Sequence, residues 1–550
     1  MSAPALRTPG GAVASLSRLD RWIAVVSPQR AVRRVRARLL LETLGRAYEG
    51  SANGRRTEDW FTADGGSVSA ETRYALATLR NRSRDLCRNN PYGRRAIRRL
   101  ATSVVGSYGI SATLTGPNQR AVARMTDLWT QWTTATLCDA RGKQTFGGLQ
   151  GLAARTLFES GEVLALRRWG PMNGGPPSPL SLRIQVIEPD YLDPQRDNSV
   201  PGYYGIAPDE IREGNRLDQG VELDGDDRAV AYWLFPRNPG DGVVAIGTTG
   251  GATGGVSSVM IPGMSSTRVD AANVLHIFQE ERAGQVRGVP VLAPVVIRIR
   301  DLDQYLDTQL VRQKIAACFA VFLSEPEGSL DLMGNQREPV DLCDHVEPGM
   351  ITKLPSGFEP SFAQPQSVED KQFVTEILQG IASGTGLPYE ELAADYSQVN
   401  FSSARMARTT FNELVNELQW LVVIPQFCDR VFGWFRDACV TAGVPGAESV
   451  GVEWTTPRKT LTDPAREIPA IISGVRAGLM SPQEAIRELG YDVETVLDEW
   501  QAFTKMVDER GLVLDIDPRK VAKTGNPQPA WILDPESSAA AALNGNGAAD

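Results

Sequence analysis

The chain has 550 residues and a formal net charge of −9, with 42% hydrophobic and 22% charged residues. This length exceeds what one hydrophobic core supports, so we expect two or more domains. A negative total argues against a general nucleic-acid-binding protein. The charge is uneven, because residues 1–100 hold 20 arginines, no lysine and 8 acidic residues, which gives +12, and the other 450 residues hold −21.

Cysteine and hydropathy patterns exclude two further classes. The six cysteines are scattered without a C-x-x-C pair, which predicts neither a zinc site nor a disulfide framework and favours a reduced, cytoplasmic setting. No apolar run reaches the ~18 residues that a membrane-spanning helix needs, and the run from Trp420 to Ile424 stops at Pro425. The N-terminus has no signal-peptide pattern. We therefore expect no membrane partner.

The basic N-terminal region begins with an arginine-rich arm over residues 1–70 and continues into a helical pattern over 71–105, interrupted once at Asn90-Pro91. After the proline, an apolar stripe recurs at helical spacing. Four arginines lie on the other side of this helix as two i,i+4 pairs. Such pairs suit either a phosphate backbone or the acidic surface of a neighbouring subunit. The four are Arg94, Arg95, Arg98 and Arg99.

The middle of the chain alternates between helix and strand patterns. Residues 119–170 predict two amphipathic helices, the second running into GEVLALRRW. Strands follow at SLRIQVIEPDYL, at AVAYWLF (229–235) and at NVLHIF. Between the last two lies a flexible Gly-, Ser- and Thr-rich stretch, 239–268, which lacks the G-K-[ST] of a phosphate-binding loop.

The second half is dominated by helices. The longest candidate covers 291–320, about 45 Å at ~1.5 Å per residue, and a mixed insert with many turn residues follows it. A second helix is expected at 368–383, with Ser367 as its cap, and a long helix at about 402–440. Ser481-Pro482 with Glu484 marks a further helix start.

Candidate catalytic residues are few. The chain has two histidines, of which His276 lies in an apolar strand and is expected to be a hydrogen-bonded structural residue. His345, beside Cys343 and Asp344, has too few regularly spaced ligands for a metal. The acid pairs Glu390-Glu391 and Asp301-Asp303 are too ordinary to indicate catalysis. We predict no enzyme activity, no metal and no cofactor.

Five segments together resemble the lambda-family portal proteins of tailed bacteriophages, in the same order over most of residues 75–515. They are RNRSRDLCRNNPYGRRAIRRLATSVVGSYGI, HIFQEERAGQVRGVPVLAPVVIRIRDLDQYLDTQLVRQKIAACFAVFL, VEPGMITKLPSGF, GLPYEELAADYSQVNFSSARM and DPAREIPAIISGVRAGLMSPQEAIRELGYD. The resemblance implies an α+β portal fold of wing, stem, clip and crown, with long stem and wing helices and a small mixed α/β clip, assembled as a ring.

The resemblance also assigns parts of the chain to these regions. In chain order they are a basic N-terminal arm (1–70), a wing of helices and then strands (71–290), stem helix 1 (291–320), the clip (321–366), stem helix 2 (367–385), the tunnel loop (386–403), the long wing helix and following strand (404–454), a helical crown (455–535) and a disordered tail (536–550).

The implied function is a portal, or head–tail connector: a dodecameric ring at one capsid vertex through which terminase packs double-stranded DNA and through which the DNA is ejected. Implied partners are the terminase large subunit at the clip, a head-completion or adaptor protein, the major capsid protein and the scaffold. The implied location is the virion, with assembly in the host cytoplasm. Two alternatives stay open: a metal-dependent nucleic-acid enzyme, and a capsid or scaffolding structural protein.

The resemblance places the segment 386–403 at the narrowest part of the channel. Twelve copies of −9 make −108, and a conduit lined by neutral polar groups would touch DNA without gripping it. The four arginines 94, 95, 98 and 99 would then contact a neighbouring subunit or the capsid. The alternative for the segment is an ordinary connector buried against its own subunit. The expected DNA-facing residues are Tyr396, Ser397, Gln398, Asn400, Ser402 and Ser403, and Val399 and Phe401 are expected to pack against a neighbouring loop.

Overall fold

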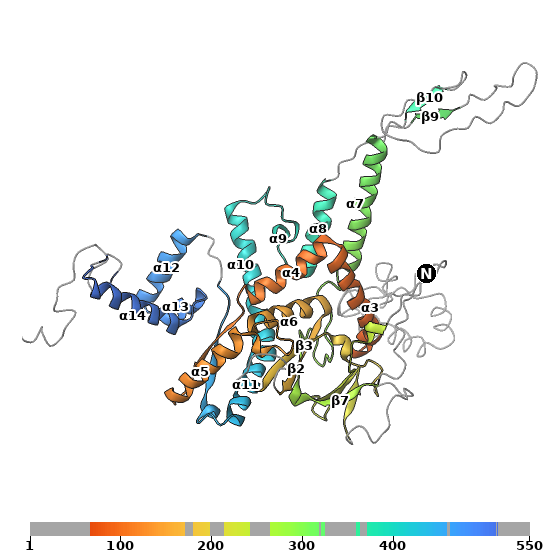
Figure 1. Cartoon of the computed structure of the whole chain (residues 1–550). Coiled ribbons are helices and arrows are strands. Elements are labelled where there is room, and N and C mark those ends of the chain that lie inside the picture. The colour runs from red at the N-terminus through yellow and green to blue at the C-terminus, as the bar shows by residue number, and fades with distance from the viewer. Residues whose placement is uncertain are drawn as a thin grey trace, which may run out of the picture. The chain divides into compact units, whose positions relative to one another are not determined.

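The computed structural model describes residues 66–170, 180–198, 214–242, 265–317, 321–324, 359–362, 371–458 and 463–512, together with 514 and 517. The helices and strands below belong to one compact unit, Val68–Asp550 (Figure 1). Several sequence predictions lie outside the described residues: the arm before residue 66, residues 243–264 of the Gly-, Ser- and Thr-rich stretch, His345, the Ser367 cap and the tail 536–550.

The interrupted helix is confirmed. Helix α3 covers Val68–Asn89 and α4 covers Pro91–Val105. Asn90 separates them because its side-chain oxygen accepts hydrogen bonds from the backbone N–H groups of Tyr92 and Gly93, at 3.0 Å each. Proline at the first helical position needs no N–H partner. The predicted apolar stripe is buried, with Ile97, Leu100, Ala101 and Val104 each at most 4% exposed.

The predicted helices within 119–170 are α5, Gln119–Thr134, and α6, Phe146–Ser160. The expectation that the second helix runs into GEVLALRRW is wrong, because Glu162–Trp169 is strand β2. Gly161 ends α6 in the left-handed region (φ 86°), where a Cβ would collide with the backbone of Val289 and Pro290.

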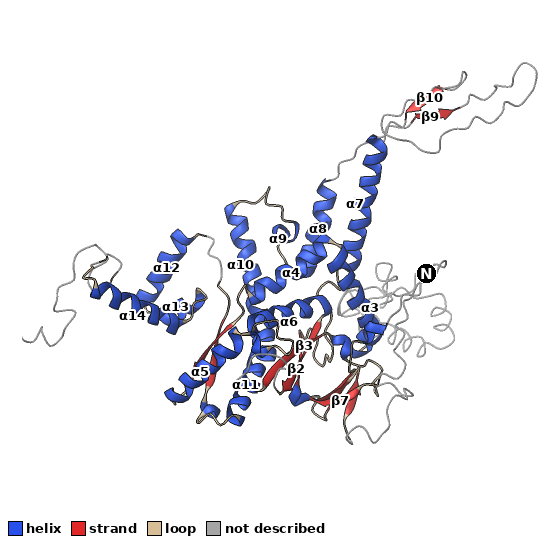
Figure 2. Ribbon diagram, viewed as in Figure 1, coloured by secondary structure: helices blue, strands red, loops and turns tan. Residues whose placement is uncertain are grey.

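Strand β2 is the centre of a three-stranded antiparallel sheet in the order β3-β2-β8 (Figure 2). Strand β3 is Leu182–Ile187 and β8 is Val274–Phe278, so both of these predicted strands are confirmed. The first four residues of β2 are completely buried, and a strand buried on both faces shows no alternation of apolar and polar residues.

A second, four-stranded antiparallel sheet has the order β4-β5-β6-β7. Its strands are β4 (Arg216–Asp218), β5 (Val221–Leu223), β6 (Ala229–Leu234) and β7 (Thr267–Asp270). Strand β6 confirms the strand expected at 229–235. A separate antiparallel pair, β1 (Ser111–Thr115) with β11 (Gly451–Thr455), joins segments far apart in the chain.

The two helices expected around the insert are present with shifted starts. Helix α7 covers Val296–Ala317, because residues 291–295 form turns before it, and α8 covers Lys371–Thr385. They lie side by side, and Tyr305 meets Phe373 edge to face at 5.1 Å. Between them in the chain, β9 (Val321–Ser324) and β10 (Glu359–Phe362) form an antiparallel pair.

The long helix expected at about 402–440 is confirmed as a continuous run. It consists of α10 (Phe401–Glu417), a π-helical segment (Leu418–Cys428) and α11 (Asp429–Thr441). Pro425 lies within the π-helical segment, and proline and π turns are both common causes of helix irregularity. Phenylalanines on the buried side of this run pack against Trp129 and Phe146.

Three shorter helices follow, α12 (Pro464–Arg476), α13 (Pro482–Glu488) and α14 (Val493–Glu509). The helix start predicted at Ser481 is confirmed, since its hydroxyl oxygen accepts a hydrogen bond from the Glu484 N–H at 3.0 Å. The first residue of α13 is Pro482, which sits where its missing N–H costs nothing.

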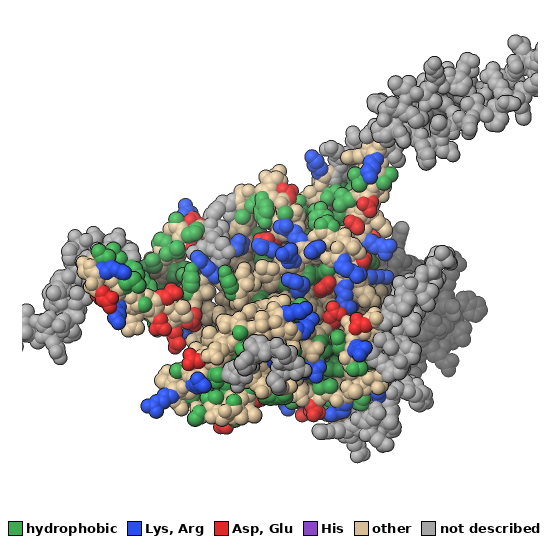
Figure 3. All heavy atoms as spheres, in the orientation of Figure 1, with side chains coloured by type: hydrophobic (Ala, Val, Ile, Leu, Met, Phe, Trp, Pro, Cys, Tyr) green, Lys and Arg blue, Asp and Glu red, His purple; other side chains and the backbone are tan. Residues whose placement is uncertain are grey.

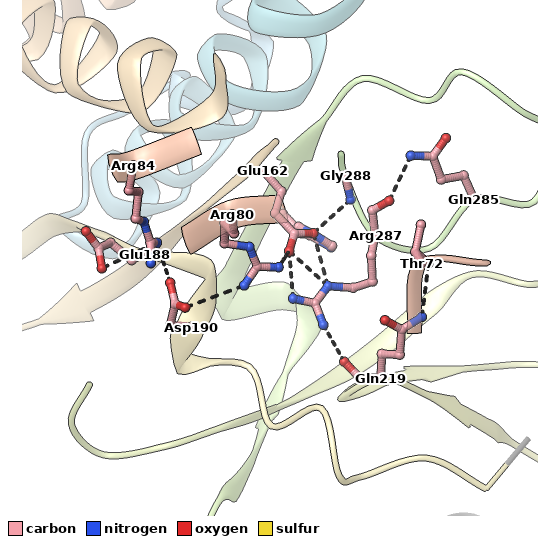
Figure 4. A network of polar contacts seen from close by, with 11 residues as sticks. Thr72, Arg80, Arg84, Glu162, Glu188, Asp190, Gln219, Gln285, Arg287 and Gly288 are labelled. Carbon is pink, nitrogen blue, oxygen red and sulfur yellow. Dashed lines mark hydrogen bonds and ion pairs between the residues drawn. The ribbon is translucent and has the colours of Figure 1, made fainter. Parts of the chain in front are cut away.

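A completely buried carboxylate, that of Glu162, joins these elements (Figure 4). Arg287 donates to it at 2.6 Å from Nη2 and 3.0 Å from Nε, and Arg80 of α3 donates at 2.8 Å. The backbone N–H of Gly288 and the Nε2 of His276 lie 2.9 and 2.8 Å from its Oε2. His276 is therefore the hydrogen-bonded structural histidine that the sequence predicts.

Electrostatics keep this carboxyl ionised. Burial by itself raises the pKa of Glu162, but Arg287, the hydrogen bond with His276 and Arg80 together hold the pKa well below its usual 4.5. The cluster extends outward, because Arg80 also lies 3.7 Å from Asp190, which forms an ion pair with Arg84. One network thus links α3, β2, β8 and the loop before α7.

We predict that Glu162→Gln lowers the free energy of unfolding by about 3–5 kcal/mol, because two buried arginines lose their countercharge. Chemical denaturation followed by circular dichroism measures this loss. The pKa of Glu162 is lowered on folding, so its contribution is present above pH ~4.5 and is lost as the pH falls towards the folded-state pKa. The difference between wild type and variant should therefore shrink on acidification.

The matched control is Glu71→Gln. Glu71 forms an ion pair with Arg282 at 3.0 Å, but the two side chains are 48% and 54% exposed. Exposed pairs contribute about 0–1 kcal/mol, so this variant should stay close to wild type. If both variants lost the same free energy of unfolding, burial would not increase the contribution of the Glu162 carboxylate to stability.

Candidate functional site

The segment between α9 and α10 is the part of the predicted tunnel loop that lies outside helices. The structure places helix α9, Tyr389–Ala393, and the first turn of α10 inside the range 386–403, so residues 394–400 remain between them. Ala394 ends α9 in the left-handed region at φ 58°, a conformation in which an L-residue other than glycine is uncommon. The chain therefore leaves α9 in a defined direction without a glycine.

Asp395 organises the beginning of this segment. Its carboxylate accepts a hydrogen bond from the Ser397 N–H at 3.0 Å and another from the Tyr389 hydroxyl at 3.2 Å. The hydrogen bond from the Ser397 backbone is the main reason why the pKa of Asp395 lies below its ordinary value. Asp395, the only acid of the segment, thus forms its hydrogen bonds with neighbouring residues of the same chain.

Asn400 and Ser403 fix the other end. The Ser403 N–H donates to the Asn400 side-chain oxygen at 2.8 Å, and the Asn400 N–H donates to the Ser403 hydroxyl at 3.2 Å. This reciprocal pair is a capping box, which satisfies backbone donors at the start of a helix. Two of the six residues predicted to face DNA are therefore engaged by the first turn of α10.

The remaining residues expected to face DNA are exposed, whereas one of the two expected to pack against a neighbouring loop is half-buried. Tyr396 is 57% exposed, and Ser397, Gln398 and Ser402 are exposed as well. Val399, expected to pack against a neighbouring loop, is half-buried and lines a cavity of its own subunit. The side chain of Phe401 lies outside the described residues.

Helix α4 supports the segment from one side. Arg95 donates to the backbone oxygen of Glu391 at 2.6 Å, and Arg99 donates to the Glu391 carboxylate at 2.9 Å. The hydrogen bond with Glu391 raises the pKa of Arg99. One of the two predicted arginine pairs, Arg95 and Arg99, therefore holds α9 of the same chain, and contact of the four arginines with a neighbouring subunit or the capsid stays a prediction.

The other pair, Arg94 and Arg98, is exposed. Figure 3 shows arginine and lysine side chains gathered over the region of α4. Glu391, the partner that distinguishes the two pairs, lies almost 300 residues from α4, and no local pattern in the sequence indicates this contact. The exposed pair remains available to another molecule.

Two of the four acidic candidates have structural partners. Glu391 binds Arg99, and Asp303 of α7 accepts a hydrogen bond from Asn90 at 3.2 Å. Within the described parts of the chain, no group of three or more His, Cys, Asp or Glu side chains could hold a metal ion. Over the same residues, no helix combines the length and hydropathy needed to cross a membrane.

We predict that Asn400→Ala destabilises the start of α10 by about 1 kcal/mol, the usual cost of losing an N-cap. Amide hydrogen exchange in the first turn of α10 should accelerate about fivefold. Asn400→Asp should retain the slow exchange, because aspartate caps equally well, and Ser402→Ala should have no effect. Equal exchange in wild type and Asn400→Ala would contradict the role of this cap.

Comparison with protein families gives a match over most of the chain. The family described as phage portal protein, lambda family, matches residues 53–419. A probable portal protein of Halomonas phage phiHAP-1 is 23% identical over 488 residues, which cover 83% of this chain and 86% of the relative. The portal protein of Escherichia phage N15 is 22% identical over 468 residues, which cover 76% of this chain and 81% of that protein.

Portal protein B of Escherichia phage lambda is 23% identical over 265 residues, covering 41% of this chain and 49% of that protein. Among solved structures, the neck of a native GTA particle computed with C12 symmetry aligns with a TM-score of 0.41 and 13% identity, over 76% of this chain and 94% of that chain. The family match spans well over half of the sequence. The chain belongs to the lambda family of phage portal proteins.

Proposed function

We propose that this chain is the portal, or head–tail connector, of a tailed phage or phage-like particle. Twelve copies form a closed ring at one vertex of the capsid in the virion, after assembly in the host cytoplasm. Double-stranded DNA passes through the ring when terminase packs the particle and again on ejection. The chain acts as a conduit, and the chemistry of packaging is left to its partner.

The observation that carries this proposal is the order of elements within the matched family. Helices α7 and α8 lie side by side and flank the strand pair β9–β10. The exposed segment 394–400 and the continuous helix from Phe401 to Thr441 follow directly. In the proposed ring, α7 and α8 form the stem, residues 321–366 form the clip, and 386–403 form the tunnel loop, of which 394–400 lie outside helices.

The same assignment names the partners. Terminase would bind at the clip through its large subunit, and a head-completion or adaptor protein would join after packaging. The major capsid protein and the scaffold would surround the ring. The exposed pair Arg94 and Arg98 supports contact with the acidic surface of a neighbouring subunit or of the capsid, because the chain beyond residue 100 carries −21.

The composition of the tunnel loop supports sliding contact with DNA. Residues 386–404 contain no lysine or arginine, and each phosphate that a protein neutralises adds salt-dependent affinity through counterion release. The exposed side chains of Tyr396, Ser397 and Gln398 offer hydrogen bonds without a positive charge. A moving duplex would therefore meet polar groups that do not hold it.

We predict that the purified chain forms rings with a central hole in negative-stain images. Arg94→Glu combined with Arg98→Glu should reduce the fraction of rings, since this exposed pair would face an acidic neighbour. The matched control is Arg120→Glu with Arg124→Glu, an exposed i,i+4 pair on α5. A monomeric or dimeric wild type would count against the portal function, and normal rings with reduced DNA affinity in the Arg94/Arg98 variant would overturn the subunit contact.

We further predict that Ser397→Lys with Gln398→Lys impairs packaging while rings still form. New positive groups at a DNA-facing loop should raise affinity for double-stranded DNA and steepen its salt dependence by about 0.9 per phosphate contacted. DNA binding at several salt concentrations measures this slope. Ser397→Asn with Gln398→Asn is the neutral control, and an unchanged slope in the lysine variant would show that the loop does not face DNA.

A further inference from the structure

A cavity of about 510 Å³ lies between α4, the segment 394–400, α10 and the strand end at 456–458. This volume is within the range of sites that bind ligands or peptide side chains. Apolar walls come from Val399, Ala407, Phe411, Val415 and Pro457. The cavity is therefore shaped to receive apolar side chains.

Two polar atoms at this cavity are unsatisfied. Gln419 is only 2% exposed, and its amide nitrogen donates to the Val104 carbonyl at 2.6 Å. Its Oε1 and the Nε of Arg408 are both buried and have no hydrogen-bond partner among the described residues. Buried polar groups are normally hydrogen-bonded, so these two atoms indicate an occupant that supplies a donor and a carboxylate.

The charges of the residues that line the cavity also indicate an occupant with a carboxylate. Three arginines and two glutamates line the cavity. Glu391 is already paired with Arg99, and Arg458 donates to the neutral hydroxyl of Tyr491 at 2.7 Å. Arg408 and Arg458 therefore leave a positive surplus over Glu390, and this surplus favours an acidic ligand.

We propose that residues 530–536 of this chain, AWILDPE, occupy the cavity. Beyond residue 523, bulky apolar side chains stand next to one another only at Trp531, Ile532 and Leu533, and two acids follow them closely, Asp534 and Glu536. Trp531, Ile532 and Leu533 match the apolar walls, and the two carboxylates match Arg408 and Arg458. A backbone N–H of the segment supplies the donor that the Gln419 oxygen lacks.

Charge distinguishes this segment from the N-terminal arm. Residues 1–65 hold 11 arginines against 6 acids, whereas the sequence from 524 to 550 holds three acids and no lysine or arginine. An arginine-bearing cavity repels the first and attracts the second. The charge of the cavity therefore favours the C-terminal segment over the N-terminal arm as its occupant.

Hydrogen exchange of the full chain, read by mass spectrometry, tests this docking. Residues 528–536 should exchange about tenfold or more slowly than 537–550, which serve as the internal reference. Arg408→Glu should remove that protection, and Arg408→Glu combined with Asp534→Arg should restore it. Arg405→Glu, an exposed change on the same helix, should leave it intact.

Two results would overturn the proposal. The first is exchange of residues 528–536 that is as fast as that of 537–550 in the wild-type chain. The second is an Arg408→Glu variant that loses protection on another surface of the described elements while 528–536 is unchanged, which would identify a second copy of the chain as the occupant. Neither readout depends on DNA packaging, so it separates this inference from the portal function.

Discussion

The ionised carboxylate of Glu162 is the constraint on which the rest of the structure depends. It is 0% exposed, and a buried charge without partners costs several kcal/mol. Its partners come from residues 80, 276 and 287, so α3, β8 and the loop before α7 must all reach β2 together. Because α3 runs directly into α4 through Asn90, this arrangement also orients α4. Arg95 and Arg99 of α4 then hold Glu391, and with it the start of the proposed tunnel loop.

Local signals made much of this fold predictable. The break at Asn90-Pro91 and the helix start at Ser481 each rest on hydrogen bonds between near neighbours, so the sequence contains the whole cause. Strand β2 was missed because its buried residues show no alternation, and an apolar run of this length suits a helix equally well. The side chains that bind Glu162 lie 82 to 125 residues away, and no local pattern reveals such contacts.

In the candidate site, too, local sequence signals predict some features, whereas others depend on distant contacts. Residue type alone does not distinguish a polar side chain that faces solvent from one that caps a helix, so Asn400 and Ser403 were grouped with Ser402. The i,i+4 spacing of the arginines correctly indicated two pairs on one side of α4. The structure adds that Arg95 and Arg99 face Glu391 whereas Arg94 and Arg98 face outward. That difference depends on the tertiary position of α9.

These contacts limit how far the segment 394–400, the proposed tunnel loop, can move. Ala394 and the capping box at Asn400 fix its two ends, and the five residues between them span at most about 18 Å when fully extended. Asp395 shortens this reach further by accepting the Ser397 N–H. Tyr396, Ser397 and Gln398 therefore stay close to the N-terminal end of α10. In a ring, the width of the opening would be set by the position of the long helix more than by a swing of the loop, and a change of channel diameter would require α10 itself to shift.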